Sequence, residues 1–170
     1  MDRVQSALED AGLDPTRLTL EITETAVLAD SVAASSALRE LARMGVHLAV
    51  DDFGTGYSSV SHLQRFQLRQ LKIDKGFVAG LEGSWRDRAL VDGLVQLAHA
   101  VRLEAAAEGV ETPAQLDSLR RMGCDLAQGF LLSPPISEAE FGQLWRQRSG
   151  AIANWPARGR RAVEVAGVAS

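Results

Sequence analysis

The 170-residue sequence predicts an α/β fold in which parallel strands alternate with helices. Short runs of β-type character recur along the chain, and longer runs with helical periodicity separate them. With 46% apolar residues, the chain is long enough for one domain with a hydrophobic core and short for two. We therefore expect one compact α/β unit.

Five segments are expected to form the strands of this unit. In chain order they are Leu18–Ile22, His47–Asp51, Gln70–Asp74, Glu104–Glu108 and Asp125–Phe130.

The segments between these strands have helical spacing and recognisable ends. Thr112 followed by Pro113 suits the start of a helix, and Gly123 suits its end. Ser137 and Glu140 form a capping box at the start of another. Helices are therefore expected over Val4–Leu13, Asp30–Met44, Arg88–Val101, Thr112–Gly123 and from Ser137 onward.

The predicted domain covers residues 1–147, and residues 148–170 are expected to form a flexible tail because they lack periodicity. The helix at Val4–Leu13 resembles one that follows a strand, yet no strand precedes it in this chain. The pattern therefore suggests a series of strand–helix units that has lost its beginning.

Charge and cysteine content exclude several classes of function. The net charge is -4, the pI is about 5.4 and the charged residues are interspersed, so no broad surface for duplex nucleic acid or an anionic membrane is expected. Cys124 has no second cysteine to pair with, which predicts a buried structural thiol in an intracellular, cytoplasmic protein. No run reaches the ~18 apolar residues of a membrane segment.

Polar residues lie at or near the ends of all five predicted strands: Glu21, the pair Asp51 and Asp52, Lys72, Glu108 and Gln128. The 107 positions from Glu21 to Gln128, divided over four steps, give about 27 residues per step. That spacing is close to one unit of a (β/α)8 barrel, in which strand ends meet at one rim and carry the chemistry. The polar groups are therefore expected to converge.

This combination of side chains favours divalent-metal chemistry. Converging carboxylates repel one another unless something organises them, and Mg²⁺ and Mn²⁺ prefer oxygen ligands. Two such ions can hold the attacking and leaving oxygens of a phosphodiester, so hydrolysis of that bond is the reaction this set suits. A single acidic residue at a strand end is more often a helix cap or a solvated loop residue. Only their joint placement supports the metal hypothesis.

The short motifs around these residues are more specific than their spacing. In order they are LEITET at Leu20–Thr25, DDFGTGYSS at Asp51–Ser59, LKIDK at Leu71–Lys75, AEGVET at Ala107–Thr112, and QGF at Gln128–Phe130 with Pro135. Together they resemble the EAL family of bacterial cyclic di-GMP phosphodiesterases over about residues 4–147. The resemblance implies an incomplete TIM-like (β/α) barrel that opens cyclic di-GMP to linear pGpG with Mg²⁺ or Mn²⁺.

The resemblance also implies roles for the metal ligands. Glu21 and Asp51 correspond to ligands of the first of two ions. Asp51 is expected to bridge both ions, and Asp52 to bind the second.

Three further positions correspond to the catalytic groups. Lys72 matches the lysine that holds the nucleophilic water and offsets charge on the phosphate. Glu108 matches a carboxylate once regarded as the general base and now placed in the water shell of the second ion. Gln128 matches the glutamine that hydrogen bonds near that water.

A third group of positions surrounds this site. Glu24 matches the glutamate that anchors the family's mobile loop, Asp51–Ser59. Substrate-binding or supporting contacts are implied for Asp74, Glu111, Gly129 and Pro135.

The chain departs from the family at its beginning. The Glu-Ala-Leu strand is absent, and so is the asparagine that binds the first ion, because Asn154 in the predicted tail is the only asparagine. The first ion therefore lacks two ligands, and an open barrel edge is expected. Either the sequence is a fragment of a longer protein or its gene is truncated, and intact residues at all the retained positions favour a fragment.

Two hypotheses for function follow. The first is part of a cyclic di-GMP phosphodiesterase that is inactive as this chain alone, has an upstream sensory or GGDEF-type domain in a longer parent, and forms a homodimer. The second is a non-catalytic cyclic di-GMP receptor or protein-interaction module.

A kinase assignment from Asp52-Phe53-Gly54 fails. No Gly-rich nucleotide loop precedes this triplet, and neither a His-Arg-Asp nor an Ala-Pro-Glu motif occurs.

Overall fold

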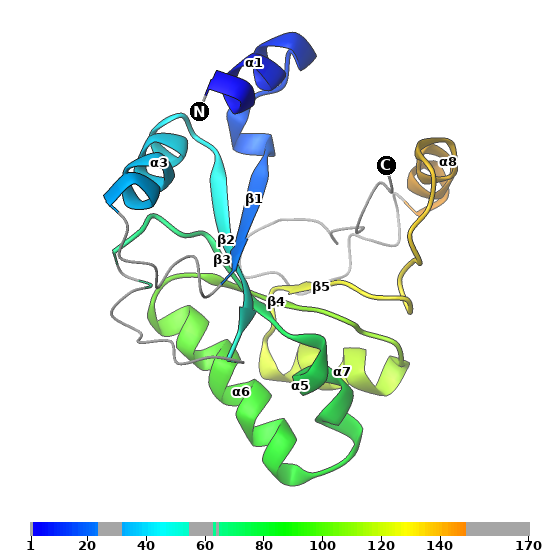
Figure 1. The fold of residues 1–170 in the computed structure, drawn as a ribbon. Coiled ribbons are helices and arrows are strands. Elements are labelled where there is room, and N and C mark those ends of the chain that lie inside the picture. The colour runs from blue at the N-terminus through cyan, green and yellow to red at the C-terminus, as the bar shows by residue number, and fades with distance from the viewer. Residues whose placement is uncertain (1, 24–31, 55–62, 64, 149–170) are drawn as a thin grey trace.

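A single five-stranded parallel sheet organises the chain (Figure 1). The computed structural model describes residues 2–23, 32–54, 63 and 65–148. The strands are β1 (Thr19–Thr23), β2 (His47–Phe53), β3 (Gln70–Ile73), β4 (Glu104–Ala107) and β5 (Leu126–Ala127), and each pairs with the next in sequence. All five predicted strands are present. Their order places all the carboxyl ends along one rim, as in a barrel that is not closed.

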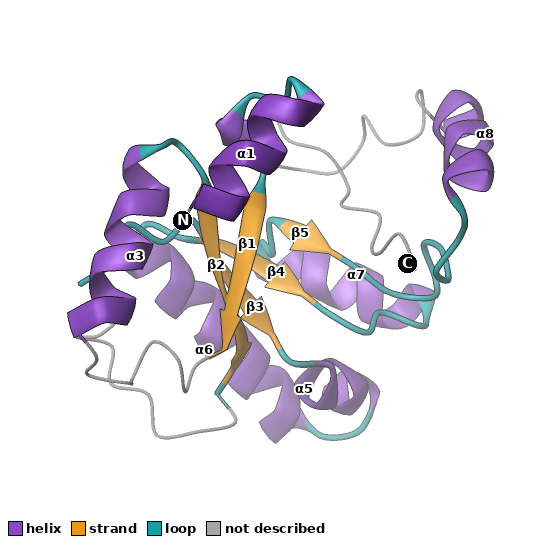
Figure 2. Cartoon of the chain, turned by 45° about the horizontal axis from the view of Figure 1, so that its top comes forward, coloured by secondary structure: helices purple, strands orange, loops and turns teal. Residues whose placement is uncertain are grey.

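Helices lie before, between and after the strands. They are α1 (Asp2–Ala11), α3 (Val32–Arg43), α5 (Lys75–Ala79), α6 (Trp85–Ala100), α7 (Pro113–Met122) and α8 (Glu138–Arg148), with short 3-10 turns at Pro15–Arg17 and Gly80–Glu82. Helix α3 contacts β2, while α6 contacts β3 and β4 (Figure 2). In the described part of the chain, no helix combines the length and the apolar character that crossing a membrane requires.

Local capping explains where the helices begin. Helix α7 follows the predicted N-cap Thr112, which also forms a capping box with Gln115, and it ends at Gly123 in the left-handed conformation, with φ 79°. Helix α6 begins at Trp85, three residues before the predicted start at Arg88, because the Ser84 hydroxyl accepts a hydrogen bond from the amide of Asp87. Helix α5 was not predicted, since five residues are too few to show helical periodicity.

The end of the chain lies mostly outside the described residues. Helix α8 extends to Arg148, one residue into the segment predicted as a tail. Positions 149–170, and the helix start expected at Asp30, are outside the described residues.

Two apolar clusters form the core. The larger lies between the sheet and α6, and the smaller joins α1, α3 and β2. Fully buried members of the larger cluster include Val50, Leu71, Ile73, Val91 and Val95, and the smaller contains Leu8, Leu41, Val46 and Leu48. Strand β3 is buried at all four positions, including Lys72. A lysine at the centre of a core strand requires compensating charge.

The only cysteine is a structural thiol, as expected. Cys124 is fully buried, and its Sγ lies 3.3 Å from the carbonyl oxygen of Ala105 and 3.2 Å from that of Leu126. Burial raises its pKa to about 12, so the thiol is protonated and unreactive at pH 8.

We expect Ellman's reagent at pH 8 to label the native chain far more slowly than the urea-unfolded chain. The absorbance of the released thiolate measures both rates. Equal rates would show that the site around Cys124 is open in the native state.

Candidate metal site at the carboxyl ends of the strands

The predicted polar residues come from neighbouring strands. Asp51 and Asp52 lie near the carboxyl end of β2, Lys72 lies in β3, and Glu108 directly follows β4. Glu21 lies in the middle of β1 rather than at its end, and it is paired with Ala49 of β2. Parallel pairing in register brings these side chains to one end of the sheet.

Lys72 is the centre of this group. Its Nζ lies 2.5 Å from Glu108 Oε1, 2.7 Å from Glu21 Oε1 and 3.1 Å from Asp51 Oδ1. The lysine side chain is only 6% exposed, whereas those of Glu108, Asp51 and Glu21 are 18%, 26% and 47% exposed. One buried ammonium therefore joins carboxylates from three different strands or strand ends.

Burial and charge shift the pKa values of this group. Burial is the largest influence on Lys72 and favours the neutral amine, but hydrogen bonds to the three carboxylates outweigh it and raise the pKa of Lys72. Burial raises the pKa of Glu108 more than its contact with Lys72 lowers it, and the neighbouring carboxylates add to that rise. The lysine is thus firmly charged, and ionisation of Glu108 is less favoured than that of a free glutamate.

A second arrangement joins Asp51, Asp52 and Glu108. One carboxylate oxygen from each lies within 4.8 Å of the others. A regular strand would direct two consecutive side chains to opposite faces. Here the β2–β3 register shifts between Val50 and Phe53, and Asp52 adopts a left-handed conformation with φ 55°. The bulge explains how both aspartates reach the same rim.

The donor set fits a divalent cation. Asp51 Oδ1 is buried and, apart from its contact with the Lys72 ammonium, has no hydrogen-bond partner among the described residues. A buried carboxylate oxygen with this single contact, beside two further carboxylates, offers the oxygen ligands that Mg²⁺ and Mn²⁺ prefer. Sequence reasoning placed Glu108 in the water shell. Because Glu108 belongs to the group of three carboxylates, direct binding of an ion is an alternative role for it.

The remaining predicted site residues are distributed around this rim. Gln128 directly follows β5, and its backbone amide donates to the carbonyl oxygen of Ala107 at 2.8 Å. Gly129 packs against the backbone of Val110. Glu24 lies outside the described residues, as does much of the predicted mobile loop.

Three other candidates, Asp74, Glu111 and Pro135, lie apart from the carboxylates around Lys72 in the contacts described. The Asp74 carboxylate caps α5 by accepting a hydrogen bond from the amide of Gly76 at 2.8 Å. The amide of Glu111 donates to the Gln115 side chain at 2.8 Å, and Pro135 is exposed. Among their described contacts, none of these three reaches the carboxylates around Lys72.

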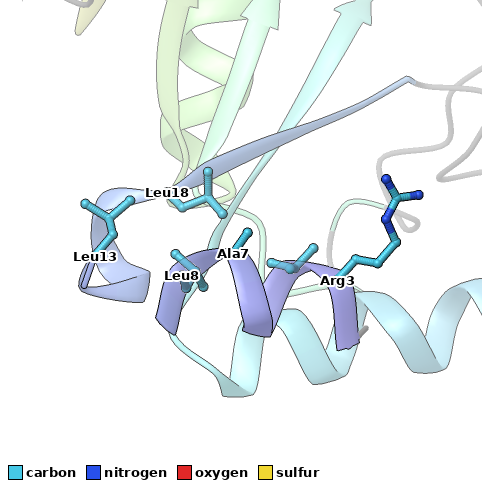
Figure 3. A pocket seen from close by; sticks show the side chains of 6 residues that line it. Arg3, Ala7, Leu8, Leu13 and Leu18 are labelled. Carbon is cyan, nitrogen blue, oxygen red and sulfur yellow. The ribbon is translucent and has the colours of Figure 1, made fainter. Parts of the chain in front are cut away.

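An open apolar groove lies away from the carboxylates and was missed by sequence reasoning. Its volume is about 630 Å³, and it lies between α1 and the start of β1 (Figure 3). The lining residues are Arg3, Val4, Ala7, Leu8, Leu13 and Leu18. None of them belongs to the acidic rim, so the groove is separate from the candidate metal site.

The sheet topology and the acidic rim define an open (β/α)-barrel domain with a candidate metal site. The family model of the EAL domain matches residues 1–135, and this chain belongs to the EAL domain family. The expected fold class, an incomplete TIM-like barrel, is thereby confirmed, since solved EAL domains share the fold.

Known proteins resemble the chain over most of its length. It is 44% identical over 136 residues to the bifunctional diguanylate cyclase/cyclic di-GMP phosphodiesterase MucR of Pseudomonas aeruginosa, covering 80% of this chain and 20% of MucR. The structure of the P. aeruginosa MucR phosphodiesterase in complex with c-di-GMP superposes with a TM-score of 0.78 at 43% identity, covering 82% of this chain and 57% of that one. A manganese and c-di-GMP complex of Klebsiella pneumoniae BlrP1 gives 0.70 at 36% identity, covering 76% and 33%. The chain thus spans about a fifth of the length of its relative MucR.

Proposed function

We propose that this chain is the metal-binding part of a cyclic di-GMP phosphodiesterase, in which two divalent ions support hydrolysis of c-di-GMP to linear pGpG. The observation that carries this proposal is the convergence of Asp51, Asp52 and Glu108 beside the buried Lys72. The similarity to a MucR phosphodiesterase bound to c-di-GMP supports the choice of substrate.

The acidic residues of the rim and Lys72 have different proposed roles. Asp51, Asp52 and Glu108 would hold an ion, which supplies a polarised water and neutralises charge on a phosphodiester. Lys72 offers a positive charge to the phosphate and to the attacking water. Gln128, at the end of the neighbouring strand, would orient that water.

Ion choice and ligand count complete the proposal. Mg²⁺ or Mn²⁺ suits the all-oxygen donors, and the manganese complex of BlrP1 supports a divalent ion. Glu21 is held by Lys72 and lies outside the close group of three carboxylates. Because the Glu-Ala-Leu motif and the ligand asparagine are absent from the sequence, we propose that residues 1–170 bind one ion but do not turn over substrate.

A homodimer and an upstream sensory or GGDEF-type domain are further parts of the proposal. The name of MucR, which combines a cyclase with a phosphodiesterase, supports the second. The alternative, a receptor that binds c-di-GMP without cleaving it, is favoured by the absence of the two first-ion ligands.

Calorimetry and product analysis on residues 1–170 test these statements. We expect Mn²⁺ to bind, Asp51→Asn to abolish that binding, and no pGpG to form by chromatography. Asp117→Asn is a matched control, because Asp117 is 60% exposed on α7 and contacts only Arg120 among its described ion-pair partners.

Two results would contradict the proposal. If Asp51→Asn binds Mn²⁺ as well as the native chain does, the proposed metal site is wrong. Metal-dependent turnover that Asp51→Ala abolishes would show that the chain alone is an active enzyme. The family activity is tested by adding upstream coding sequence, which should restore a Glu-Ala-Leu strand, a ligand asparagine and formation of pGpG.

A further inference from the structure

The contacts of Lys72 overlap with the candidate ion ligands. Lys72 Nζ contacts Glu108 at 2.5 Å and Asp51 at 3.1 Å, and both belong to the group of three carboxylates. Asp52, the third member of that group, is exposed. A protein cation therefore already engages two of the three side chains that an ion would use.

The atoms that Lys72 contacts show how closely its ammonium approaches the carboxylates of this group. The contacts of Lys72 involve Oδ1 of Asp51, which is buried and otherwise lacks a hydrogen-bond partner among the described residues, and Oε1 of Glu108. An ammonium at these distances would repel a divalent ion bound to the same carboxylates, and burial strengthens the repulsion. The ion and the ammonium cannot both keep their best contacts.

Glu21 differs from the other two partners of Lys72. It lies 2.7 Å from Nζ but is not one of the three close carboxylates, and its side chain is 47% exposed. An ion in the group of three does not compete for Glu21. This glutamate can keep the ammonium when Asp51 and Glu108 release it.

We propose that Lys72 is the internal counter-cation of the acidic rim, and that a divalent ion binds by displacing its ammonium from Glu108 and Asp51 towards Glu21. The inference rests on the metal site of the proposed function and adds a positioning residue that sets ion affinity. Lys72 keeps the carboxylates together before the ion arrives and lowers the apparent affinity for it. Its release also frees the ammonium to meet an anionic substrate.

A measurement on the native chain tests the displacement directly. The sequence contains only two lysines, Lys72 and Lys75, so ¹⁵N-lysine labelling gives two side-chain signals. The buried, hydrogen-bonded ammonium of Lys72 should be protected from exchange, whereas that of the exposed Lys75 should not. Saturating Mg²⁺, which is diamagnetic, should shift or broaden the Lys72 signal and leave Lys75 unchanged. An unchanged Lys72 signal at saturation would overturn the proposal.

Variants test the effect on affinity. Lys72→Met is expected to bind Mn²⁺ roughly tenfold more tightly than the native chain by calorimetry, within the range of measured coupling between two sites. Lys75→Met, which removes an exposed lysine three residues away, should match the native affinity. A lysine that merely supports the fold would leave affinity unchanged or reduce it when replaced, so equal or weaker binding by folded Lys72→Met overturns the inference.

The outcomes separate the two proposals. If neither the native chain nor Lys72→Met binds Mn²⁺, the metal site itself is wrong and both proposals fail. If both bind with the same affinity, the proposed function stands and the counter-cation inference fails. Should Lys72→Met be unfolded without metal, the lysine signals of the native chain decide the question.

Discussion

Replacing Lys72 with methionine is expected to lower the free energy of unfolding of the metal-free chain by about 3 kcal/mol. The substitution removes the only described cation that contacts Glu21, Asp51 and Glu108, and it leaves buried negative charge without compensation. Breaking a buried ion pair on one side costs about 3–5 kcal/mol, and the partial exposure of the carboxylates places this case at the lower end. Urea unfolding in EDTA, followed by circular dichroism, measures the loss.

Two comparisons make this prediction specific. Lys75→Met should leave stability within about 0.5 kcal/mol of the native chain, as is usual for exposed substitutions. Adding Glu108→Gln to Lys72→Met should recover part of the loss, because it removes one unpaired charge. A Lys72→Met variant as stable as Lys75→Met would show that the ammonium contributes nothing to the fold.

The penalty for losing Lys72 should also depend on pH. The pKa of Glu108 is raised, so its proton is favoured in the folded state, and a neutral Glu108 requires no counter-cation. The destabilisation caused by Lys72→Met should therefore shrink as the pH falls through the pKa of Glu108. It should be largest above that pKa, where Glu108 is ionised and requires a counter-cation.

Gly129→Ala is the second substitution with a large expected effect. A Cβ at this position would lie 2.2 Å from both the amide nitrogen and the carbonyl oxygen of Val110. These backbone atoms cannot move freely, because Val110 donates to Gln128 at 3.0 Å and accepts from Leu131 at 3.0 Å. Steric overlap and strained hydrogen bonds together should cost about 3 kcal/mol or more in unfolding free energy.

Gly93→Ala is the matched control for this change. Gly93 lies inside α6, and apart from the backbone of its own helix and its chain neighbours an added Cβ would meet no atom within 4 Å. Alanine is the better helix former, so this variant should be more stable by about 0.5–1 kcal/mol. The same chemical change should thus have opposite signs at the two sites, as measured by urea unfolding. Equal stability of Gly129→Ala and the native chain would mean that the Gln128–Gly129 turn does not pack against Val110 in solution.

The strand pattern predicted most of the fold but not all the element lengths. Residues 125–130 were expected to form the fifth strand, whereas β5 contains only Leu126 and Ala127. Gly129 then packs closely on the backbone of Val110, the Leu131 amide donates to the carbonyl oxygen of Val110, and the Leu132 amide donates to that of Gly129. Apolar character alone does not separate a strand from a packed turn, because both bury side chains.

Strand alternation and the order of short motifs established the fold class, the family and the residues that gather at the rim. Those features are local, so they can be read from residue types and their spacing in the sequence. The tertiary structure alone decided that one buried ammonium holds Glu21, Asp51 and Glu108 together, and that a bulge at Asp52 brings consecutive aspartates to one side. Both depend on strand register and on a left-handed backbone at a residue other than glycine. These are set by packing between segments far apart in the chain, so no local pattern records them.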